Sequence, residues 1–245
     1  MTASRAALTR DSLRLKITVQ RVRLGDEVYR VISPSKPIRH GAFFQSHTSY
    51  NLYADRADGR RIGALWLLAA RSPRSLVYLP LRAPARKYGG EWDEETPFDL
   101  VLAHREVQFR PSRWKRLRTI MRTGTVPREL RTASVPESDL LPDPGEIDYA
   151  APSRREPREL LHQHVHAETL FLTGGTTAFR EAAPHLFAVT KDGPPAAATQ
   201  LYYSGGCNYH VCRSLYRWAD LETHGWEQLH MEFRPAWFGW SSEAG

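Results

Sequence analysis

A histidine, a nearby glutamate and two cysteines are the residues of this chain whose types and spacing suit metal chemistry. His166-Ala167-Glu168 is followed by Cys207 and Cys212, the only 2 cysteines among 245 residues. One imidazole and two thiolates suit zinc, and three protein ligands leave a fourth tetrahedral position for water. Glu168 is placed to carry protons for that activated water. The spacing therefore predicts a catalytic Zn²⁺ site with His166, Cys207 and Cys212 as ligands.

The same residues resemble the zinc motif of the cytidine-deaminase-like superfamily, H-x-E followed by P-C-x-x-C. The run His-Ala-Glu-Thr-Leu-Phe-Leu at 166–172 is similar to the helix-opening run of its AID/APOBEC-like and toxin-type nucleic-acid deaminases. The resemblance covers the C-terminal part of the chain. It implies an α/β (α+β) fold, in which helices flank a mixed β-sheet. It also implies zinc-dependent deamination of cytosine to uracil in DNA or RNA, with Glu168 as catalytic residue, in a toxin-type or mutagenic role.

The cysteine segment departs from this motif. The spacing is C-x4-C, Gly206 stands where the motif has proline, and the segment after Glu168 is longer than usual. Cys207 and His210 have a C-x-x-H spacing, so His210 is an alternative third ligand to Cys212. A disulfide between the two cysteines is a further alternative.

Three other interpretations remain open for the histidines. His164, His166 and Glu168 alternate as they would along one face of a β-strand, which suits a cupin-like metalloenzyme. A structural zinc in a non-enzymatic nucleic-acid-binding protein is the second interpretation. The third is a histidine cluster that is unrelated to a pair of buried cysteines.

Positive charge is concentrated upstream of these residues. Basic residues exceed acidic ones by 9 in residues 1–150, whereas acidic residues exceed basic ones by 2 in 151–245. The run 105–131 is rich in arginine, which favours a polyanionic partner unless the run is only a solvated helix face. We expect nucleic acid to be bound by phosphate contacts and by stacking on aromatic rings. The candidate residues are Arg113, Arg116, Arg118, Tyr203 and Trp218.

Composition limits the class of protein. Hydrophobic residues make up 41% of the chain, enough for a packed core of one large or two small domains. No apolar run has the length of a membrane span, and the N-terminus has no signal-peptide core, so we expect a cytoplasmic protein that does not contact membranes. The expected domains are a basic, mostly β region at 1–125, a proline-rich linker at 126–150 and a deaminase-like zinc domain at 151–245.

Apolar periodicity predicts the elements of the N-terminal region. Alternation predicts a hairpin from 13–19 to 28–32 with a turn at Gly25-Asp26, a second hairpin from 49–53 to 62–68, and a strand at 75–79. Residues 98–109 suit another strand. Residues 111–122 suit a short basic helix with Trp114 and Met121 on its buried side.

The C-terminal region is predicted to alternate helices and strands. Helices are expected at 159–172, from Thr176 to Ala183 and at 211–221. Strands are expected at 186–190, 199–203 and 228–233.

Overall fold

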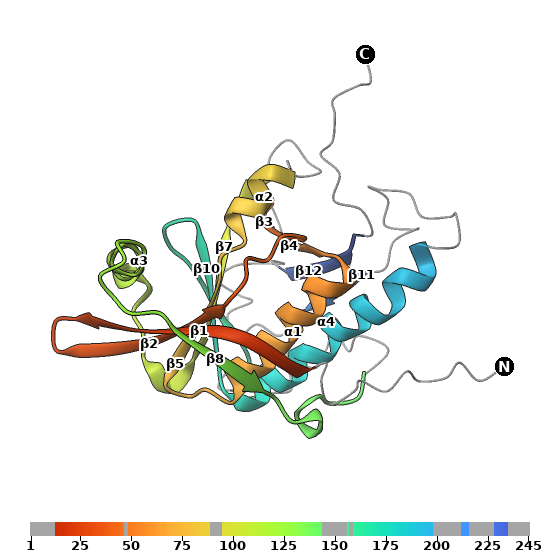
Figure 1. The fold of residues 1–245 in the computed structure, drawn as a ribbon. Coiled ribbons are helices and arrows are strands. Elements are labelled where there is room, and N and C mark those ends of the chain that lie inside the picture. The colour runs from red at the N-terminus through yellow and green to blue at the C-terminus, as the bar shows by residue number, and fades with distance from the viewer. Residues whose placement is uncertain are drawn as a thin grey trace, which may run out of the picture.

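The computed structural model describes residues 13–46, 49–88, 95–143, 156, 159–197, 212–215 and 228–234. Within these ranges the backbone alone is described at 87–88, 196–197, 212–215 and 228. The described chain forms two β-sheets flanked by helices (Figure 1). This confirms an α+β fold with mixed sheets.

The larger sheet has seven strands in the order β8-β1-β2-β5-β7-β10-β9. Two neighbouring pairs, β2 with β5 and β7 with β10, are parallel, and the others are antiparallel. Its strands are β1 (Arg14–Leu24), β2 (Glu27–Pro34), β5 (Ser75–Leu79), β7 (Asp99–His104), β8 (Glu129–Ser134), β9 (His162–Val165) and β10 (Thr169–Gly174).

The smaller sheet has five strands in the order β11-β12-β4-β3-β6. The two sheets meet where β6 runs into β7, and the Phe98 amide donates a 2.8 Å hydrogen bond to the Phe43 carbonyl at this junction. The strands of the smaller sheet are β3 (Gly41–Gln45), β4 (Ser49–Ala54), β6 (Thr96–Pro97), β11 (Cys212–Leu215) and β12 (Gln228–Phe233).

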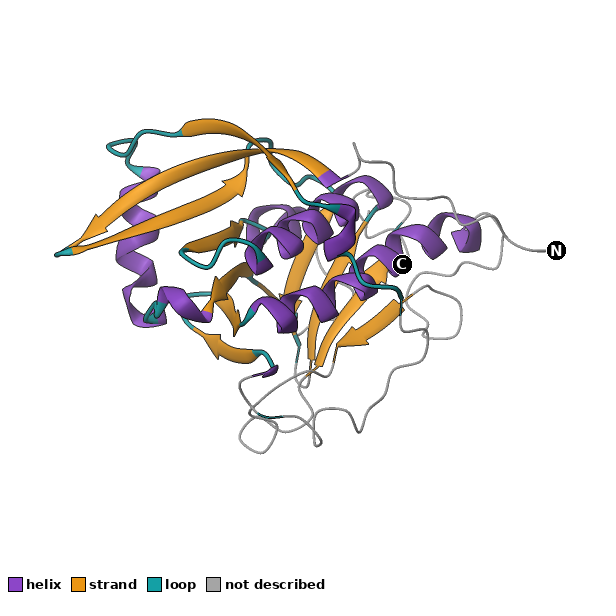
Figure 2. Ribbon diagram, turned by 90° about the horizontal axis from the view of Figure 1, so that it is seen from below, coloured by secondary structure: helices purple, strands orange, loops and turns teal. Residues whose placement is uncertain are grey.

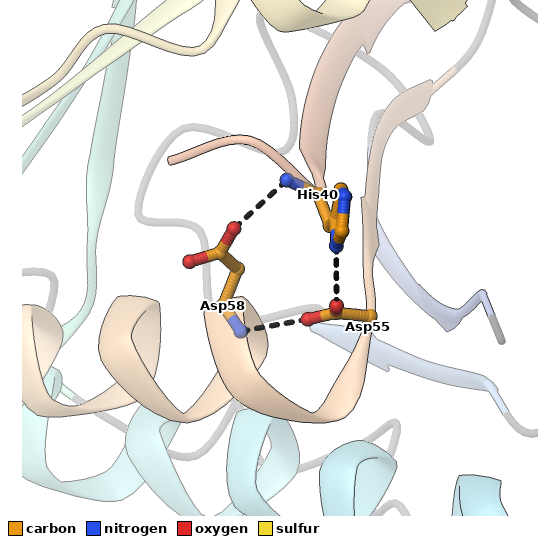
Figure 3. A group of neighbouring side chains, drawn as sticks. All are labelled: His40, Asp55 and Asp58. Atoms are coloured by element: carbon orange, nitrogen blue, oxygen red, sulfur yellow. Dashed lines mark hydrogen bonds and ion pairs between the residues drawn. The ribbon is translucent and has the colours of Figure 1, made fainter. Parts of the chain in front are cut away.

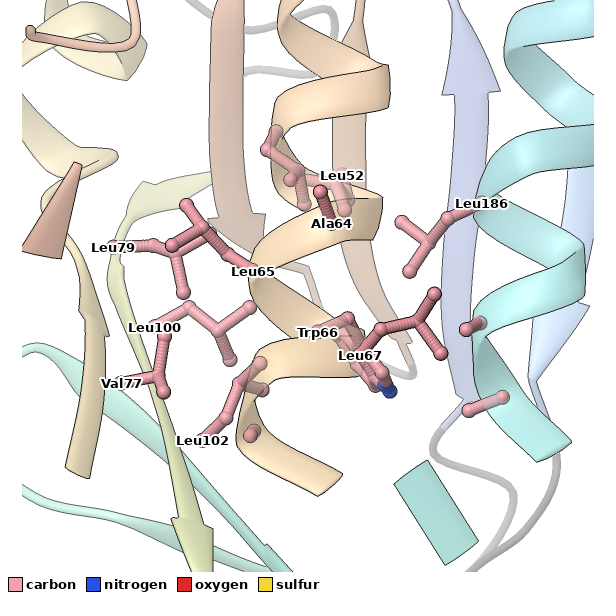
Figure 4. Packing of buried hydrophobic residues seen from close by; sticks show 14 of the residues in the cluster. Leu52, Ala64, Leu65, Trp66, Leu67, Val77, Leu79, Leu100, Leu102 and Leu186 are labelled. Atoms are coloured by element: carbon pink, nitrogen blue, oxygen red, sulfur yellow. The ribbon is translucent and has the colours of Figure 1, made fainter. Parts of the chain in front are cut away.

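Two helices, α1 (Arg56–Ala70) and α4 (Thr176–Ala197), pack side by side over the sheets (Figure 2). The close approach depends on glycines of α1: a Cβ at Gly63 would lie 2.9 Å from the Phe187 ring, and one at Gly59 would lie 2.4 Å from the Thr190 methyl group. Because α1 is apolar around most of its circumference, its side chains pack both on β5 and β7 and on α4, as Figure 4 shows for Leu65 and Leu67.

The remaining helices are short. Helix α2 (Arg82–Tyr88) packs on β3, and α3 (Trp114–Arg122) covers the opposite face of the larger sheet from α1. Trp114, Leu117 and Met121 of α3 are buried, which confirms the predicted amphipathic helix. Within the described ranges there are also three 3-10 turns, η2 (Arg105–Val107), η3 (Pro111–Arg113) and η4 (Glu137–Asp139).

Several sequence predictions are confirmed. The first hairpin is β1–β2, and Gly25 occupies its turn with a φ of +66°. The strands predicted at 75–79 and 228–233 are β5 and β12, and the first arm of the second predicted hairpin is β4. The strand predicted at 98–109 is confirmed only for 99–104, which form β7, since 105–107 form η2.

Four other predictions are wrong. Residues 62–68 belong to helix α1, because Asp55 caps a helix at this point by accepting a hydrogen bond from the Asp58 amide. Residues 159–172 form the hairpin β9–β10 rather than a helix. Helix α4 continues through the strand predicted at 186–190, and 212–215 form strand β11 rather than the start of a helix. The strand predicted at 199–203 lies outside the described residues.

Strands from both sides of the predicted linker pair with one another. Strand β10 lies parallel to β7, and β12 lies parallel to β4. One hydrophobic core contains residues from Leu13 to Phe233, and β8 forms within the segment predicted as a linker. The described residues of 1–125 and 151–245 thus share their sheets and their core.

Among the described helices, none has the length and apolar character needed to cross a membrane.

Candidate functional site

The His166-Ala167-Glu168 triplet lies in a tight β-hairpin turn. The His166 amide donates a 3.0 Å hydrogen bond to the Thr169 carbonyl, which closes the turn between β9 and β10. Ala167 and Glu168 have φ values of 51° and 54°, and positive φ at both central residues is the feature of a type I′ turn. The helix start that the deaminase resemblance implies for His166 is therefore absent.

The Glu168 carboxylate is held by arginines of α2. It forms ion pairs with Arg82 and, at 3.5 Å, with Arg86. Its side chain is 49% exposed. These ion pairs connect the turn between β9 and β10 to α2.

A buried polar network lies beside this turn, at the start of β7. Asp99 accepts hydrogen bonds from the Tyr78 hydroxyl at 3.0 Å and the Arg82 amide at 2.9 Å, and it pairs with Arg118 at 3.2 Å. Burial, followed by the charge of Asp99, raises the pKa of Tyr78. The Trp114 indole donates a 3.0 Å hydrogen bond to Thr169, which fixes α3 on the hairpin. This network is structural, since its groups satisfy one another.

The predicted zinc ligands are only partly described. Cys212 begins β11, the edge strand of the smaller sheet, whereas His166 lies at the tip of a hairpin of the larger sheet. Cys207 and the alternative ligand His210 lie outside the described residues, so the predicted ligand set remains a prediction. His164 is exposed on β9, in register with Phe171.

A different group of side chains has ligand atoms close enough together to bind a metal ion. Within the described ranges, His40, Asp55 and Asp58 have ligand atoms within 4.8 Å of one another (Figure 3). Asp58 already accepts hydrogen bonds from the Arg39 and His40 amides, both at 2.8 Å, and Arg61 contacts its other oxygen at 2.5 Å. Asp55 is the N-cap of α1. We interpret this group as the anchor of the 35–40 loop on α1, since a cation would have to displace Arg61.

The predicted nucleic-acid-binding arginines of the α3 region have different surroundings. Arg113 pairs with Glu27 and donates to the Leu24 carbonyl at 2.7 Å, and Arg118 belongs to the Asp99 network. Only Arg116 is exposed to solvent among these three. The predicted aromatic contacts, Tyr203 and Trp218, lie outside the described residues.

The smaller sheet has one apolar face. Its other face is polar on β4 and β12 but apolar on β3, where Ala42 and Phe44 pack with Tyr53 and with Ala85 of α2. Leu52, Met231 and Phe233 belong to the main core below the sheet. The residues that alternate with them face the other way, and we call this set the polar face. It consists of Asn51, Tyr53, His230 and Glu232, with Arg234 at the end of β12 and Glu95 beside them.

The register brings the polar face together from distant parts of the chain. His230 lies opposite Asn51, and Glu232 lies between Tyr53 and Cys212 on the neighbouring strands. Glu95 accepts hydrogen bonds from the Asn51 amide at 2.6 Å and from the Tyr53 hydroxyl at 3.2 Å. The Arg234 guanidinium lies 2.9 Å from Glu232 and 5.1 Å from the centre of the Tyr53 ring.

Comparisons with known proteins identify no relative. No family model, curated protein or solved structure matches the chain.

The two carboxyl groups of the polar face have opposite environments. Glu232 is 3% exposed, and burial raises its pKa to about 8, with the charge of Glu95 as the second cause. The Arg234 guanidinium, 2.9 Å away, favours the ionised form of Glu232, but burial and the charge of Glu95 outweigh it. With a pKa of about 8, Glu232 keeps its proton at neutral pH.

Sequence analysis missed the polar face, although it predicted strand 228–233. A signal was present: His230 and Glu232 alternate with Leu229, Met231 and Phe233. This alternation normally places polar residues in solvent. Only the tertiary structure shows that Glu232 is buried.

Proposed function

We propose that this protein is an enzyme whose reaction centre is the polar face, with Glu232 as general acid and Glu95 as general base. The observation that carries the proposal is the pairing of two carboxyl groups with opposite environments on one buried sheet face. Environments that separate the pKa values of two nearby acids are typical of acid–base catalysts. The proposed reaction class is hydrolysis of a polar substrate.

The roles follow from the contacts of each group. Glu95 accepts two hydrogen bonds, which orient its carboxylate on the polar face. A carboxyl group with a pKa of about 8 is protonated at pH 7 and can deliver its proton to a leaving group. Glu95 would remove a proton from the attacking water, and Arg234 would stabilise negative charge as it develops.

The protonation states can be tested without a known substrate. Protein labelled with ¹³C at the glutamate carboxyl carbon should show one resonance that titrates near pH 8 and is lost in Glu232→Gln. Glu95→Gln should shift this titration to lower pH, because it removes the second cause of the raised pKa. Glu106→Gln, at an exposed glutamate of η2, should change neither and is the control. The proposal fails if Glu232 titrates near its ordinary value of 4.5.

Activity is then sought with a panel of ester, amide, glycoside and phosphodiester substrates. Loss of a general acid or base typically lowers the rate by a hundredfold to ten-thousandfold. Both Glu95→Gln and Glu232→Gln should show such losses for any substrate that the protein hydrolyses, whereas Glu106→Gln should not.

Zinc-dependent deamination of cytosine in nucleic acid, on a cytidine-deaminase-like fold, is a second candidate. One observation favours placing it at the polar face: His230-Met231-Glu232 repeats the H-x-E spacing, and Cys212 lies in register with Glu232. A thiol and an imidazole are donors that zinc accepts, and a nearby carboxyl group can carry protons for a zinc-bound water. In this version His230 takes the place of His166 as a ligand, and Glu232 takes the place of Glu168.

Metal analysis distinguishes the two candidates. About one zinc per purified chain, retained in His166→Ala but lost in His230→Ala and Cys212→Ser, would support the metal site at the polar face. Loss of zinc in His166→Ala would support the ligand set predicted from the sequence. Metal-free, well-folded protein that forms no uracil in DNA or RNA would exclude the second candidate and leave the first.

A further inference from the structure

The outer half of the β1–β2 hairpin has one face that no described helix covers. Figure 1 shows both strands running out beyond α1 and α4. Val19 and Ile32, which lie opposite each other, belong to the core under the helices. Two residues further along each strand, the same face presents Arg21 and Arg30.

Arginines gather on this uncovered face from three strands. Arg21 lies directly opposite Arg30. Arg131 and Glu129 of β8 lie opposite Ile17 and Val19, so they point to the same side of the sheet. We call this set the arginine face; it consists of Arg21, Arg23, Arg30 and Arg131, with Glu129 as its acidic member.

Like charges directly opposite each other destabilise a sheet. Burial first, and then the charges of Arg131 and Arg21, lower the pKa of Arg30. Arg30 donates a 2.6 Å hydrogen bond to Ser75, and Arg131 pairs with Glu129 at 2.5 Å. The arginine face thus contains four guanidinium groups and one carboxylate, that of Glu129. Its net charge is therefore +3.

We propose that the arginine face binds the phosphate backbone of nucleic acid. Arg21 and Arg23 are both exposed and lie about 7 Å apart along one strand, since residues two apart on a strand share a face. The result is an extended row of cations on an open sheet, which suits an extended polyanion rather than a single phosphate ion. Guanidinium groups bind phosphate through two parallel hydrogen bonds.

This inference is independent of the reaction proposed for the polar face. It also differs from the prediction that placed nucleic-acid contacts on α3. Helix α3 lies on the opposite face of the larger sheet, and two of its three candidate arginines are engaged with Glu27 and Asp99. The exposed cations Lys115 and Arg116 of α3 therefore provide a matched control.

The test compares two double variants of equal net charge. Arg21→Glu with Arg23→Glu reverses the arginine face, and Lys115→Glu with Arg116→Glu reverses the exposed face of α3. All four side chains are exposed, and the first pair of substitutions places a carboxylate opposite Arg30, so folding should persist in both variants. Binding is measured by fluorescence anisotropy of labelled single-stranded and duplex DNA oligonucleotides over a range of salt concentrations.

The reversal at the arginine face should weaken binding on the order of tenfold or more for all sequences, whereas the α3 reversal should change it much less. Arg21→Gln with Arg23→Gln should reduce the salt slope of log K by about 2, because each lost phosphate contact removes about one unit. Equal losses in both variants would mean that only total charge matters and would overturn the proposal. A loss confined to the α3 variant, or binding to anionic lipid vesicles without binding to DNA, would overturn it as well.

Discussion

Glu95 accepts a 2.6 Å hydrogen bond from the side-chain amide of Asn51, and this bond ties the segment before β6 to the middle of the smaller sheet. Asn51 is 5% exposed, so its amide has little access to water as an alternative partner. The bond fixes the carboxylate of Glu95 on the polar face.

Asn51→Ala is therefore expected to lower the free energy of unfolding by about 1–3 kcal/mol, since it leaves a charged acceptor short of a donor. Tyr53→Phe removes the longer, 3.2 Å bond to the same oxygen and should cost less. Urea unfolding of both variants measures the difference. Equal stability of Asn51→Ala and the unmodified protein would contradict this role.

The raised pKa of Glu232 predicts a pH dependence of stability. In the native state Glu232 keeps a proton up to about pH 8, whereas the unfolded chain releases it near pH 4.5. The stabilisation from this proton is fully present below about pH 4.5 and is lost as the pH rises through 8, at no more than about 1.4 kcal/mol per pH unit. Glu232→Gln cannot ionise, so its urea midpoint should fall less between pH 5 and 8 than that of the unmodified protein. Parallel pH profiles would show that Glu232 has an ordinary pKa.

The contact between Gly63 and Phe187 predicts the effect of filling the helix interface. Alanine favours a helix over glycine by up to about 1 kcal/mol, but its Cβ would lie 2.9 Å from the Phe187 ring. Because this overlap must be relieved by moving α4, Gly63→Ala should destabilise the protein by about 1–3 kcal/mol. Adding Phe187→Leu should recover part of the loss, and strictly additive effects in thermal unfolding would contradict the contact.

Residues that adopt positive φ more readily should stabilise the hairpin turn at 167–168. Ala167 and Glu168 both have positive φ, which costs about 1–2 kcal/mol for an ordinary residue, and Asn-Gly suits this turn. Ala167→Asn with Glu168→Gly should therefore raise the melting temperature, since relief of backbone strain at two residues outweighs the loss of ion pairs whose carboxylate is 49% exposed. The same variant tests the catalytic role predicted for Glu168: uracil formation that is present in the unmodified protein and lost here would support that role.

Arg118 and Arg116 lie on one helix but should respond differently to substitution. The side chain of Arg118 is 12% exposed and pairs with the buried Asp99. Arg118→Ala should destabilise the protein by about 3 kcal/mol, because it leaves that carboxylate short of its cation. Arg116→Ala, at an exposed position, should stay within about 0.5 kcal/mol. Denaturant unfolding compares the two, and equal effects would show that Arg118 does not stabilise Asp99.

Local sequence patterns were sufficient to predict the elements that bury one apolar face. Leu15, Ile17 and Val19 alternate with polar residues, and they form β1 as predicted. Trp114, Leu117 and Met121 follow the helical period, and they form the buried side of α3. In both cases one buried face decides the conformation, and its period is visible in the sequence.

Tertiary structure decided the conformation of 159–174. This stretch lacks a period that excludes either a helix or a strand, and the Ala167-Glu168 turn has no glycine or asparagine to mark it. Residues 169–174 become a strand because they pair in parallel with β7, a distant segment of the chain. Local sequence patterns do not predict pairing between segments so far apart in the chain.

The sequence by itself determined the fold class, the uneven distribution of charge and the strand that bears His230 and Glu232. Tertiary structure alone decided which groups meet. Glu95 reaches the polar face because it bonds to Asn51 and Tyr53 of β4, the strand next to β12. Arg21, Arg30 and Arg131 share a face because β8, β1 and β2 are neighbours. The physical reason is that burial and mutual repulsion, which shift the pKa values of Glu232 and Arg30, depend on distances in space and not on separation along the chain.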